Sequence, residues 1–131
     1  MKILIAEDGF TSRVLLQELL KGYGVCHIAV DGTEAVEAAR ASLESGEPYG
    51  LICLDIMMPK MDGQEALKQI RGLEEARGIT SSQGAKILMT TALANPENLF
   101  SAFRNLCDGY LVKPILKAKL MEELRKLGFT K

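Results

Sequence analysis

Acidic, hydroxyl and basic side chains directly follow four of the short apolar runs in this sequence. In a sheet of parallel strands, the side chains at the carboxyl ends of the strands lie along one edge. We therefore expect three carboxylates, a threonine hydroxyl and a lysine ammonium group to meet at that edge. In sequence order these residues are Glu7, Asp8, Asp55, Thr91 and Lys113.

This set of side chains suits phosphoryl transfer. Clustered carboxylates repel one another, and a hard divalent cation with oxygen ligands, such as Mg²⁺, relieves that repulsion. An aspartate carboxylate can act as the nucleophile and form an aspartyl-phosphate. The lysine can pair with one carboxylate and with an incoming anion, and a metal ion with a hydroxyl donor adds to the charge stabilisation. None of the expected strand ends carries His, Cys or Ser, so a catalytic triad for acyl transfer has no candidate residues.

The apolar runs alternate with longer segments of helical period. The runs are short and rich in Ile, Leu and Val, which is typical of strands buried on both faces of a parallel sheet. The expected strands are Lys2–Ala6, Gly24–Ala29, Tyr49–Leu54, Lys86–Thr90 and Gly109–Val112. The expected helices are Thr11–Lys21, Glu34–Leu43, Gln64–Ala76, a helix opened by an Asn95-Pro96 cap, and Leu116–Leu127. This alternation predicts one doubly wound α/β domain over residues 1–131, with helices on both faces of a five-stranded parallel sheet and no output domain.

Composition and charge narrow the range of functions. The 131 residues are 47% hydrophobic and 25% charged, as in a soluble globular domain with one core. The formal net charge is −1, so no basic field predicts binding to nucleic acid or to a membrane surface. The three cysteines are dispersed and suggest neither a disulfide framework nor a metal motif. We expect a cytoplasmic monomer whose binding depends on a local site.

The motifs at the strand ends resemble the signature of response-regulator receiver domains, and the resemblance covers the whole chain. In chain order the motifs are Glu7-Asp8, Asp55 followed by Ile-Met-Met-Pro, Met61-Asp62-Gly63, Thr91-Ala92 and Lys113-Pro114. Each motif is weak alone, but together, in this order and at these spacings, they are specific. The resemblance implies a flavodoxin-like strand order 2-1-3-4-5.

The resemblance also implies a role for each residue of the set. Asp55 would accept the phosphoryl group, and Thr91 and Lys113 would bind its oxygens. Tyr110 would act with Thr91 as a conformational switch; the alternative is an ordinary half-buried core aromatic. The ligands of Mg²⁺, or of Mn²⁺ in its place, would be Asp8, Asp55, the backbone carbonyl of Met57 and, directly or through water, Glu7.

Three further residues receive structural interpretations. Pro114 would follow Lys113 through a cis bond, as is typical of the family. Asp62 with the glycine after it is interpreted as a turn and helix start rather than as part of a site. His27, the single histidine, is interpreted as a surface or strand-edge residue rather than as a phosphotransfer histidine.

The function implied by the resemblance is a two-component switch rather than an enzyme. Asp55 would receive its phosphoryl group from a sensor histidine kinase or a phosphotransfer protein, and a downstream protein would read the change on the face of the fourth helix, fifth strand and fifth helix. That face offers Phe100, Phe103, Arg104, Tyr110, Lys117 and Lys119. A phosphorelay intermediate and a phosphorylation-independent interaction module are alternatives, and the sequence does not decide between a chemotaxis-type output and a relay.

The resemblance also implies that two apolar residues influence the lifetime of the phosphoryl group. Met57 and Leu93 lie at positions where polar groups in this family help to orient the attacking water. Their apolar character predicts slow self-dephosphorylation.

Two other classes of protein fit the strand ends less well. A flavodoxin-like cofactor binder needs hydroxyls and backbone amides in its first loop to hold a phosphate, and Glu7 and Asp8 would repel one. A metal-dependent phosphatase with an aspartate nucleophile would need a second Asp two residues after it at the first strand, where this chain has Glu7-Asp8-Gly9.

Overall fold

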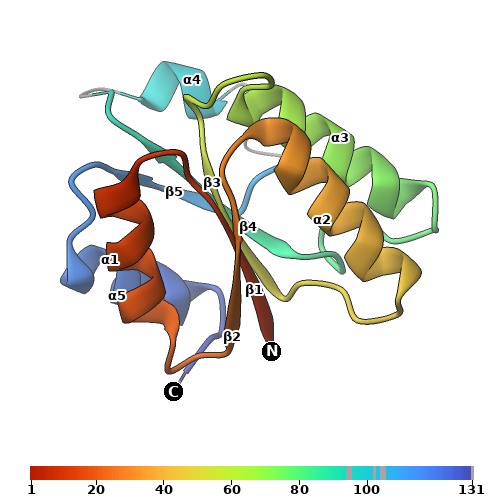
Figure 1. Cartoon of the computed structure of the whole chain (residues 1–131). Helices are drawn as coiled ribbons and strands as arrows, with labels where there is room; N and C mark the ends of the chain where they lie inside the picture. The colour runs from red at the N-terminus through yellow and green to blue at the C-terminus, as the bar shows by residue number, and fades with distance from the viewer. Residues whose placement is uncertain (94–95, 102, 104–105, 131) are drawn as a thin grey trace.

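The computed structural model describes residues 1–93, 96–101, 103 and 106–130. Within these residues five strands and five helices alternate along the chain (Figure 1). The strands are β1 (Lys2–Ala6), β2 (Val25–Ala29), β3 (Leu51–Asp55), β4 (Lys86–Thr91) and β5 (Gly109–Val112). The helices are α1 (Phe10–Leu20), α2 (Gly32–Glu44), α3 (Gly63–Glu75), α4 (Glu97–Ser101) and α5 (Lys117–Lys126).

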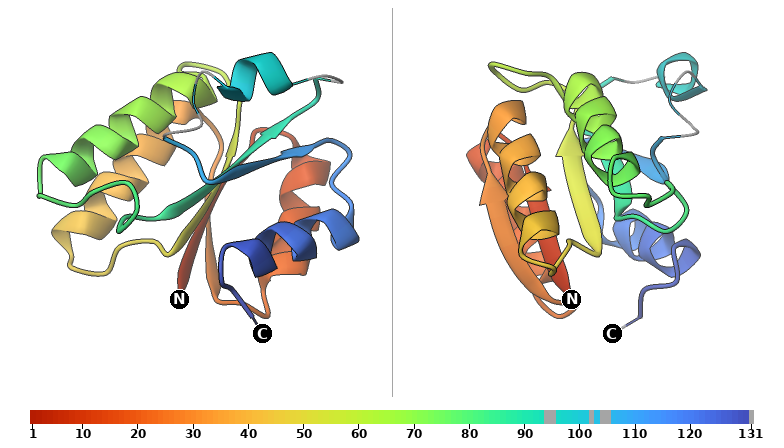
Figure 2. Two further views of the ribbon diagram at one scale, coloured as in Figure 1. Left: turned by 180° about the vertical axis from the view of Figure 1, so that it is seen from behind. Right: turned by 90° about the vertical axis from the view of Figure 1, so that its right-hand side faces the viewer.

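The strands form one parallel sheet in the order β2-β1-β3-β4-β5, which confirms the predicted fold and strand order. Helices α1 and α5 cover one face, and α2, α3 and α4 lie on the other (Figures 1 and 2). Successive residues of a strand point to opposite faces, so Cys53 packs in the core under α1 and α5 while Leu54 packs under α2 and α3. Burial of one such leucine stabilises the fold by roughly 1.5–3 kcal/mol.

β2 departs from the prediction that every strand is buried on both faces. It is an edge strand that pairs with β1 alone among the described strands. Val25 and His27 are exposed, and only Ala29, at the carboxyl end, belongs to the core under α2. The expectation that His27 lies at a strand edge is correct, and its Nδ1 atom lies 2.8 Å from the hydroxyl of Tyr49.

The ends of three strands differ from the predicted bounds. β2 begins at Val25 rather than at Gly24, and β3 begins at Leu51 rather than at Tyr49. Tyr49 is buried but precedes the hydrogen-bonded ladder. An apolar run in the sequence therefore indicates which residues are buried, but not which of them pair with a neighbouring strand. β4 continues through Thr91, one residue beyond the predicted end.

Aspartate side chains begin two of the helices. Asp31 accepts a hydrogen bond from the Glu34 amide at the start of α2, and Asp62 accepts one from the Glu65 amide at the start of α3. Such caps satisfy amides that have no partner within the helix, and the prediction that Asp62 starts a helix is confirmed. The cap predicted at Asn95 lies outside the described residues. No helix in the described ranges is long and apolar enough to cross a membrane.

The start of α3 lies against the end of β3. The Gly63 amide donates to the carbonyl of Ile56 at 2.8 Å, and a Cβ atom at position 63 would collide with the backbone carbonyl of Asp55. Only glycine permits so close an approach of two backbone segments. This contact fixes the backbone that presents the Asp55 carboxylate.

Candidate functional site

The five predicted site residues meet at the carboxyl edge of the sheet. Glu7 and Asp8 directly follow β1, Asp55 ends β3, Thr91 ends β4, and Lys113 directly follows β5. These residues are far apart in the sequence, and the parallel order of the sheet brings them together.

Lys113 links the two buried carboxylates. Its Nζ atom lies 2.9 Å from both carboxylate oxygens of Glu7 and 3.1 Å from Oδ2 of Asp55. It donates a hydrogen bond to Oε1 of Glu7 and one to Asp55, whereas Oε2 of Glu7 has the ionic contact but no hydrogen bond among the described residues. Glu7 is 1% exposed and Asp55 3% exposed. The lysine therefore pairs with two carboxylates where the sequence suggested one, and the peptide bond to Pro114 is cis, as expected.

The electrostatics of the site favour a proton or a cation on Asp55. Burial raises the pKa of Asp55, the negative charge of Glu7 raises it further, and together they outweigh the hydrogen bond from Lys113 to give a pKa of about 6. Burial lowers the pKa of Lys113, but its hydrogen bonds to Glu7 and Asp55 outweigh burial and raise it. One ammonium group thus faces two carboxylates that also repel each other.

Three carboxylates can converge on a metal ion. One oxygen each from Glu7, Asp8 and Asp55 lie within 4.8 Å of one another. Asp8 is exposed to solvent, while Glu7 and Asp55 are buried. Oxygen ligands of this kind fit Mg²⁺, which also keeps several waters, and the Glu7 oxygen without a hydrogen bond is available to such an ion or to its water.

Met57 lies in the loop directly beyond Asp55. Its backbone N–H donates to Oδ1 of Asp55 at 3.3 Å, and its side chain is 72% exposed. The loop backbone is therefore beside the carboxylate cluster, and the side chain adds no polar group to it.

Thr91 and Tyr110 occupy different environments. Thr91 is fully buried, and its hydroxyl accepts a hydrogen bond from the Leu93 amide at 3.1 Å. Tyr110 is half-buried and stacks on Phe100 of α4, with ring centroids 4.2 Å apart and ring planes at 10°. The switch role of these two residues stays a prediction.

Other polar groups near this edge were not predicted. The guanidinium of Arg13 donates to the backbone carbonyl of Glu7 at 3.3 Å. The hydroxyl of Thr90, the neighbour of Asp55 in the strand ladder, is buried and has no hydrogen-bond partner among the described residues. Nothing in the local sequence pattern indicated the contact of Arg13 or the buried hydroxyl of Thr90, because both depend on strand pairing and on rotamers.

Comparison with known proteins identifies relatives over nearly the whole chain. The model of the family described as response regulator receiver domain matches residues 3–125. The osmosensing histidine protein kinase SLN1 of Saccharomyces cerevisiae is 34% identical over 122 residues, which are 92% of this chain and 9% of that protein. The chain thus spans less than a fifth of the length of the curated relatives it matches.

Solved structures share the fold. The receiver domain of the sensor histidine kinase PA1611 from Pseudomonas aeruginosa, which has a magnesium ion coordinated in its active site cleft, is 26% identical with a TM-score of 0.75 and 97% coverage of each chain. A second match is a co-crystal structure from S. cerevisiae of the histidine phosphotransfer protein Ypd1 with the receiver domain of Ssk1. The matched chain has 29% sequence identity and a TM-score of 0.79, and the match covers 98% of this chain and 88% of the other. Both similarities extend over the strand ends that form the site.

Proposed function

The chain belongs to the response-regulator receiver family and is a phosphoacceptor switch of two-component signalling, and we propose that Asp55 is the residue that accepts the phosphoryl group. The observation that carries this proposal is the pairing of a buried Asp55 carboxylate with Lys113, beside two further carboxylates at the same sheet edge. A receiver is changed by the group it accepts, so it is a switch and not an enzyme in the usual sense.

The chemistry requires one bond to form and one to break. A carboxylate oxygen of Asp55 forms a bond to phosphorus while the bond from phosphorus to a histidine nitrogen of the donor breaks, and that nitrogen leaves with its electron pair. Charge on the transferred group spreads over its free oxygens. The ammonium group of Lys113 and the hydroxyl of Thr91, at the ends of the two neighbouring strands, would bind these oxygens.

The residues of the site fit a divalent cation. Asp8, Asp55 and the backbone carbonyl of Met57 would hold Mg²⁺, with Glu7 binding directly or through water, and Mn²⁺ has the same preference for oxygen. When bound, the ion would supply positive charge that offsets the negative charge of the transferred group. In its absence Lys113 alone offsets the charge of Glu7 and Asp55 among the described residues.

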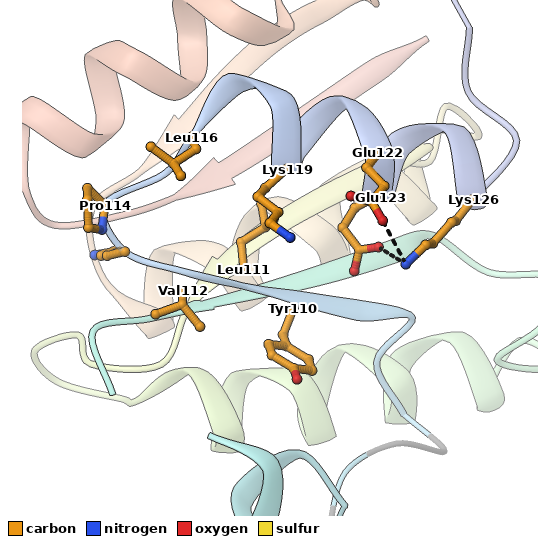
Figure 3. A pocket seen from close by; sticks show the side chains of 10 residues that line it. Tyr110, Leu111, Val112, Pro114, Leu116, Lys119, Glu122, Glu123 and Lys126 are labelled. Atoms are coloured by element: carbon orange, nitrogen blue, oxygen red, sulfur yellow. Dashed lines mark ion pairs between the residues drawn. The ribbon is translucent and has the colours of Figure 1, made fainter. Parts of the chain in front are cut away.

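The signal would leave through α4, β5 and α5. A hollow of about 540 Å³ on this face is bounded by β5 and α5. Among its lining residues, Tyr110 and Val112 lie on the strand and Lys119 on the helix (Figure 3). We propose that Thr91 and Tyr110 change position together on phosphorylation and alter this surface for a downstream protein. Arg104, another predicted residue of the face, lies outside the described residues.

The donor and the cellular setting are also proposals. Because one relative is a histidine kinase and another was crystallised with a histidine phosphotransfer protein, we propose a donor of one of these two kinds. Residues 1–131 would act as a single receiver unit, as a monomer in the cytoplasm. A role as a relay intermediate differs only in whether the phosphoryl group is passed on to a second histidine.

Intact-mass spectrometry after incubation with acetyl phosphate tests the proposal. We expect one added phosphoryl group in the presence of Mg²⁺, and none when the metal is chelated or in Asp55→Asn. Asp62→Asn is the matched control, since Asp62 caps α3 outside the carboxylate cluster, and this variant should be phosphorylated like the wild type. A phosphoryl adduct on Asp55→Asn, or none on folded wild-type protein, would contradict the assignment.

A further inference from the structure

Arg71 of α3 is buried and joins three separate segments of the chain. Its side chain is 6% exposed. Nε donates to the carbonyl of Leu106 at 2.7 Å, and Nη2 donates to Oδ2 of Asp108 at 3.0 Å, just before β5. Nη1 donates to the carbonyl of Ala85 at 2.8 Å, just before β4, and to Glu74 of its own helix at 2.8 Å. The planar guanidinium, with five donors in fixed directions, can satisfy all four acceptors at once.

The two carboxylates in contact with Arg71 are fixed by backbone amides. Oε2 of Glu74 accepts from the Ala85 amide at 2.8 Å, and Oδ2 of Asp108 accepts from the Ile87 amide at 2.8 Å. We call the contacts of Arg71 with Leu106 and Asp108 the Arg71 clamp, whereas Glu74 binds Arg71 on the side of β4. The clamp lies where β5 begins, whereas the phosphoacceptor site lies at the ends of the strands, so no residue is shared between them.

The clamp and the phosphoacceptor site lie at opposite ends of the segment that carries α4. Thr91 ends β4 at the site, and Leu106 and Asp108 are bound to Arg71 before β5 begins. Between them, Phe100 of α4 is buried and stacks on Tyr110 of β5. A second contact from α3 reaches this segment, because the ammonium group of Lys68 lies 5.7 Å from the ring centroid of Phe103.

We propose that Arg71 is a positioning residue that makes the response of Tyr110 depend on Thr91. With Leu106 and Asp108 held, a displacement of Thr91 cannot be absorbed by a shift of the whole segment and must be taken up by α4 and the ring stack. Without the clamp, the segment can shift as a whole when Thr91 moves, and Tyr110 of β5 can keep the same position whether or not Asp55 is phosphorylated. Thr91 and Tyr110 then lose their coupling free energy. The inference rests on the proposed function, since it requires that phosphorylation moves Thr91.

The experiment follows Tyr110 by fluorine NMR of protein labelled with 3-fluorotyrosine. The chain has three tyrosines, so Tyr110→Phe assigns the signal of Tyr110 by its loss. Spectra are recorded with Mg²⁺, before and after saturation with beryllium fluoride, a stand-in for the phosphoryl group on a carboxylate. Arg71→Lys keeps the charge but cannot reach all acceptors. Asp108→Asn removes the charge that Arg71 and the Ile87 amide both bind just before β5. Glu74→Gln is the matched control, because it disturbs the same buried charges at the start of β4.

We expect the shift of the Tyr110 signal in Arg71→Lys and in Asp108→Asn to fall to about half or less of the wild-type shift. In both variants the phosphorylation rate with acetyl phosphate should stay within about twofold of wild type, because the clamp lies away from Asp55. Glu74→Gln should keep the full shift although its melting temperature falls as well, which separates positioning from general loss of stability.

A full shift in Arg71→Lys and Asp108→Asn overturns the inference, and so does an equal loss of shift in Glu74→Gln. Wild-type protein that gains the phosphoryl mass without any movement of the Tyr110 signal also overturns it, while the assignment of Asp55 as phosphoacceptor stands. Absence of the mass adduct in wild type removes both proposals.

Discussion

Replacement of Lys113 by methionine should strongly destabilise the fold at neutral pH. Among the described residues, Lys113 is the single cation that forms an ion pair with the carboxylates of Glu7 and Asp55, at 2.9 and 3.1 Å, and these residues are 1% and 3% exposed. Removal of one partner from a buried ion pair costs about 3–5 kcal/mol because the remaining charge stays buried. Lys126→Met is the control: Lys126 is exposed and pairs with carboxylates of α5 at the surface, where water screens the charges, so its loss should change the free energy of unfolding very little.

The cost of Lys113→Met should depend on pH with a definite sign. The pKa of Asp55 is about 6 in the fold against 3.8 for the free side chain, and Lys113 lowers it, so the variant has a still higher pKa. A carboxyl with a raised pKa binds its proton more tightly in the folded state, so stability is gained as the pH falls through the folded pKa. Between pH 7 and pH 5 the penalty of the variant should shrink by about 1–1.5 kcal/mol, since one pH unit of differential proton binding is worth about 1.4 kcal/mol.

The penalty of Lys113→Met and its dependence on pH can be measured by urea unfolding at pH 7 and pH 5 without divalent metal. Far-ultraviolet circular dichroism follows the unfolding. Addition of Asp55→Asn to Lys113→Met should restore part of the lost stability, because it removes one uncompensated charge. A penalty as small as that of Lys126→Met, or one that is equal at the two pH values, would refute the reasoning that Lys113 is held by buried ionised carboxylates.

Three other results are expected. Gly63→Ala should destabilise the fold by about 1–3 kcal/mol because the added Cβ meets the carbonyl of Asp55. Gly72→Ala in the same helix has open space around it and should stabilise the fold by about 0.5–1 kcal/mol. Thermal melts that rank the two variants in the opposite order would contradict this packing. Affinity for Mg²⁺, measured by calorimetry, should fall about tenfold from pH 7 to pH 5 because protons compete for Asp55 below its pKa of about 6, and equal affinities would disprove the competition. The aspartyl-phosphate should be lost slowly, and Met57→Asn should speed its loss about tenfold by orienting water, as followed by phosphate release; a wild-type half-life of seconds contradicts the role given to apolar Met57 and Leu93.

Much of the fold follows from simple features of the sequence. Apolar runs of strand length separated by helical segments require a parallel sheet, and parallel strands place their carboxyl ends together. The convergence of Asp8, Asp55 and Lys113 could therefore be predicted without coordinates. The strand order came from family resemblance, because periodicity alone does not say which strands are neighbours.

The contacts that sequence reasoning missed are those set by rotamers and by long-range packing. The bond from Arg71 to Asp108 joins residues 37 positions apart, and neither residue stands out in a periodic pattern. The exposure of Val25 depends on how far α2 extends over β2, which no local signal encodes. In the same way, the sequence placed Phe100 and Tyr110 on one face of the domain but did not indicate that their rings stack on each other.

The chain order of the site residues has a consequence for folding. The ion pair between Lys113 and Glu7 spans 106 positions, and the one to Asp55 spans 58. Contacts of such long range form late, because closing the intervening loop costs entropy before any contact repays it. A nascent chain that has emerged only through β4 carries both carboxylates without their counter-ion, so they stay hydrated or protonated and hold that end of β1 and β3 open. Docking of β5 then closes the sheet and brings the Lys113 ammonium group to both buried carboxylates in a single event, so we expect the proposed phosphoacceptor site to be complete only when the last strand is in place.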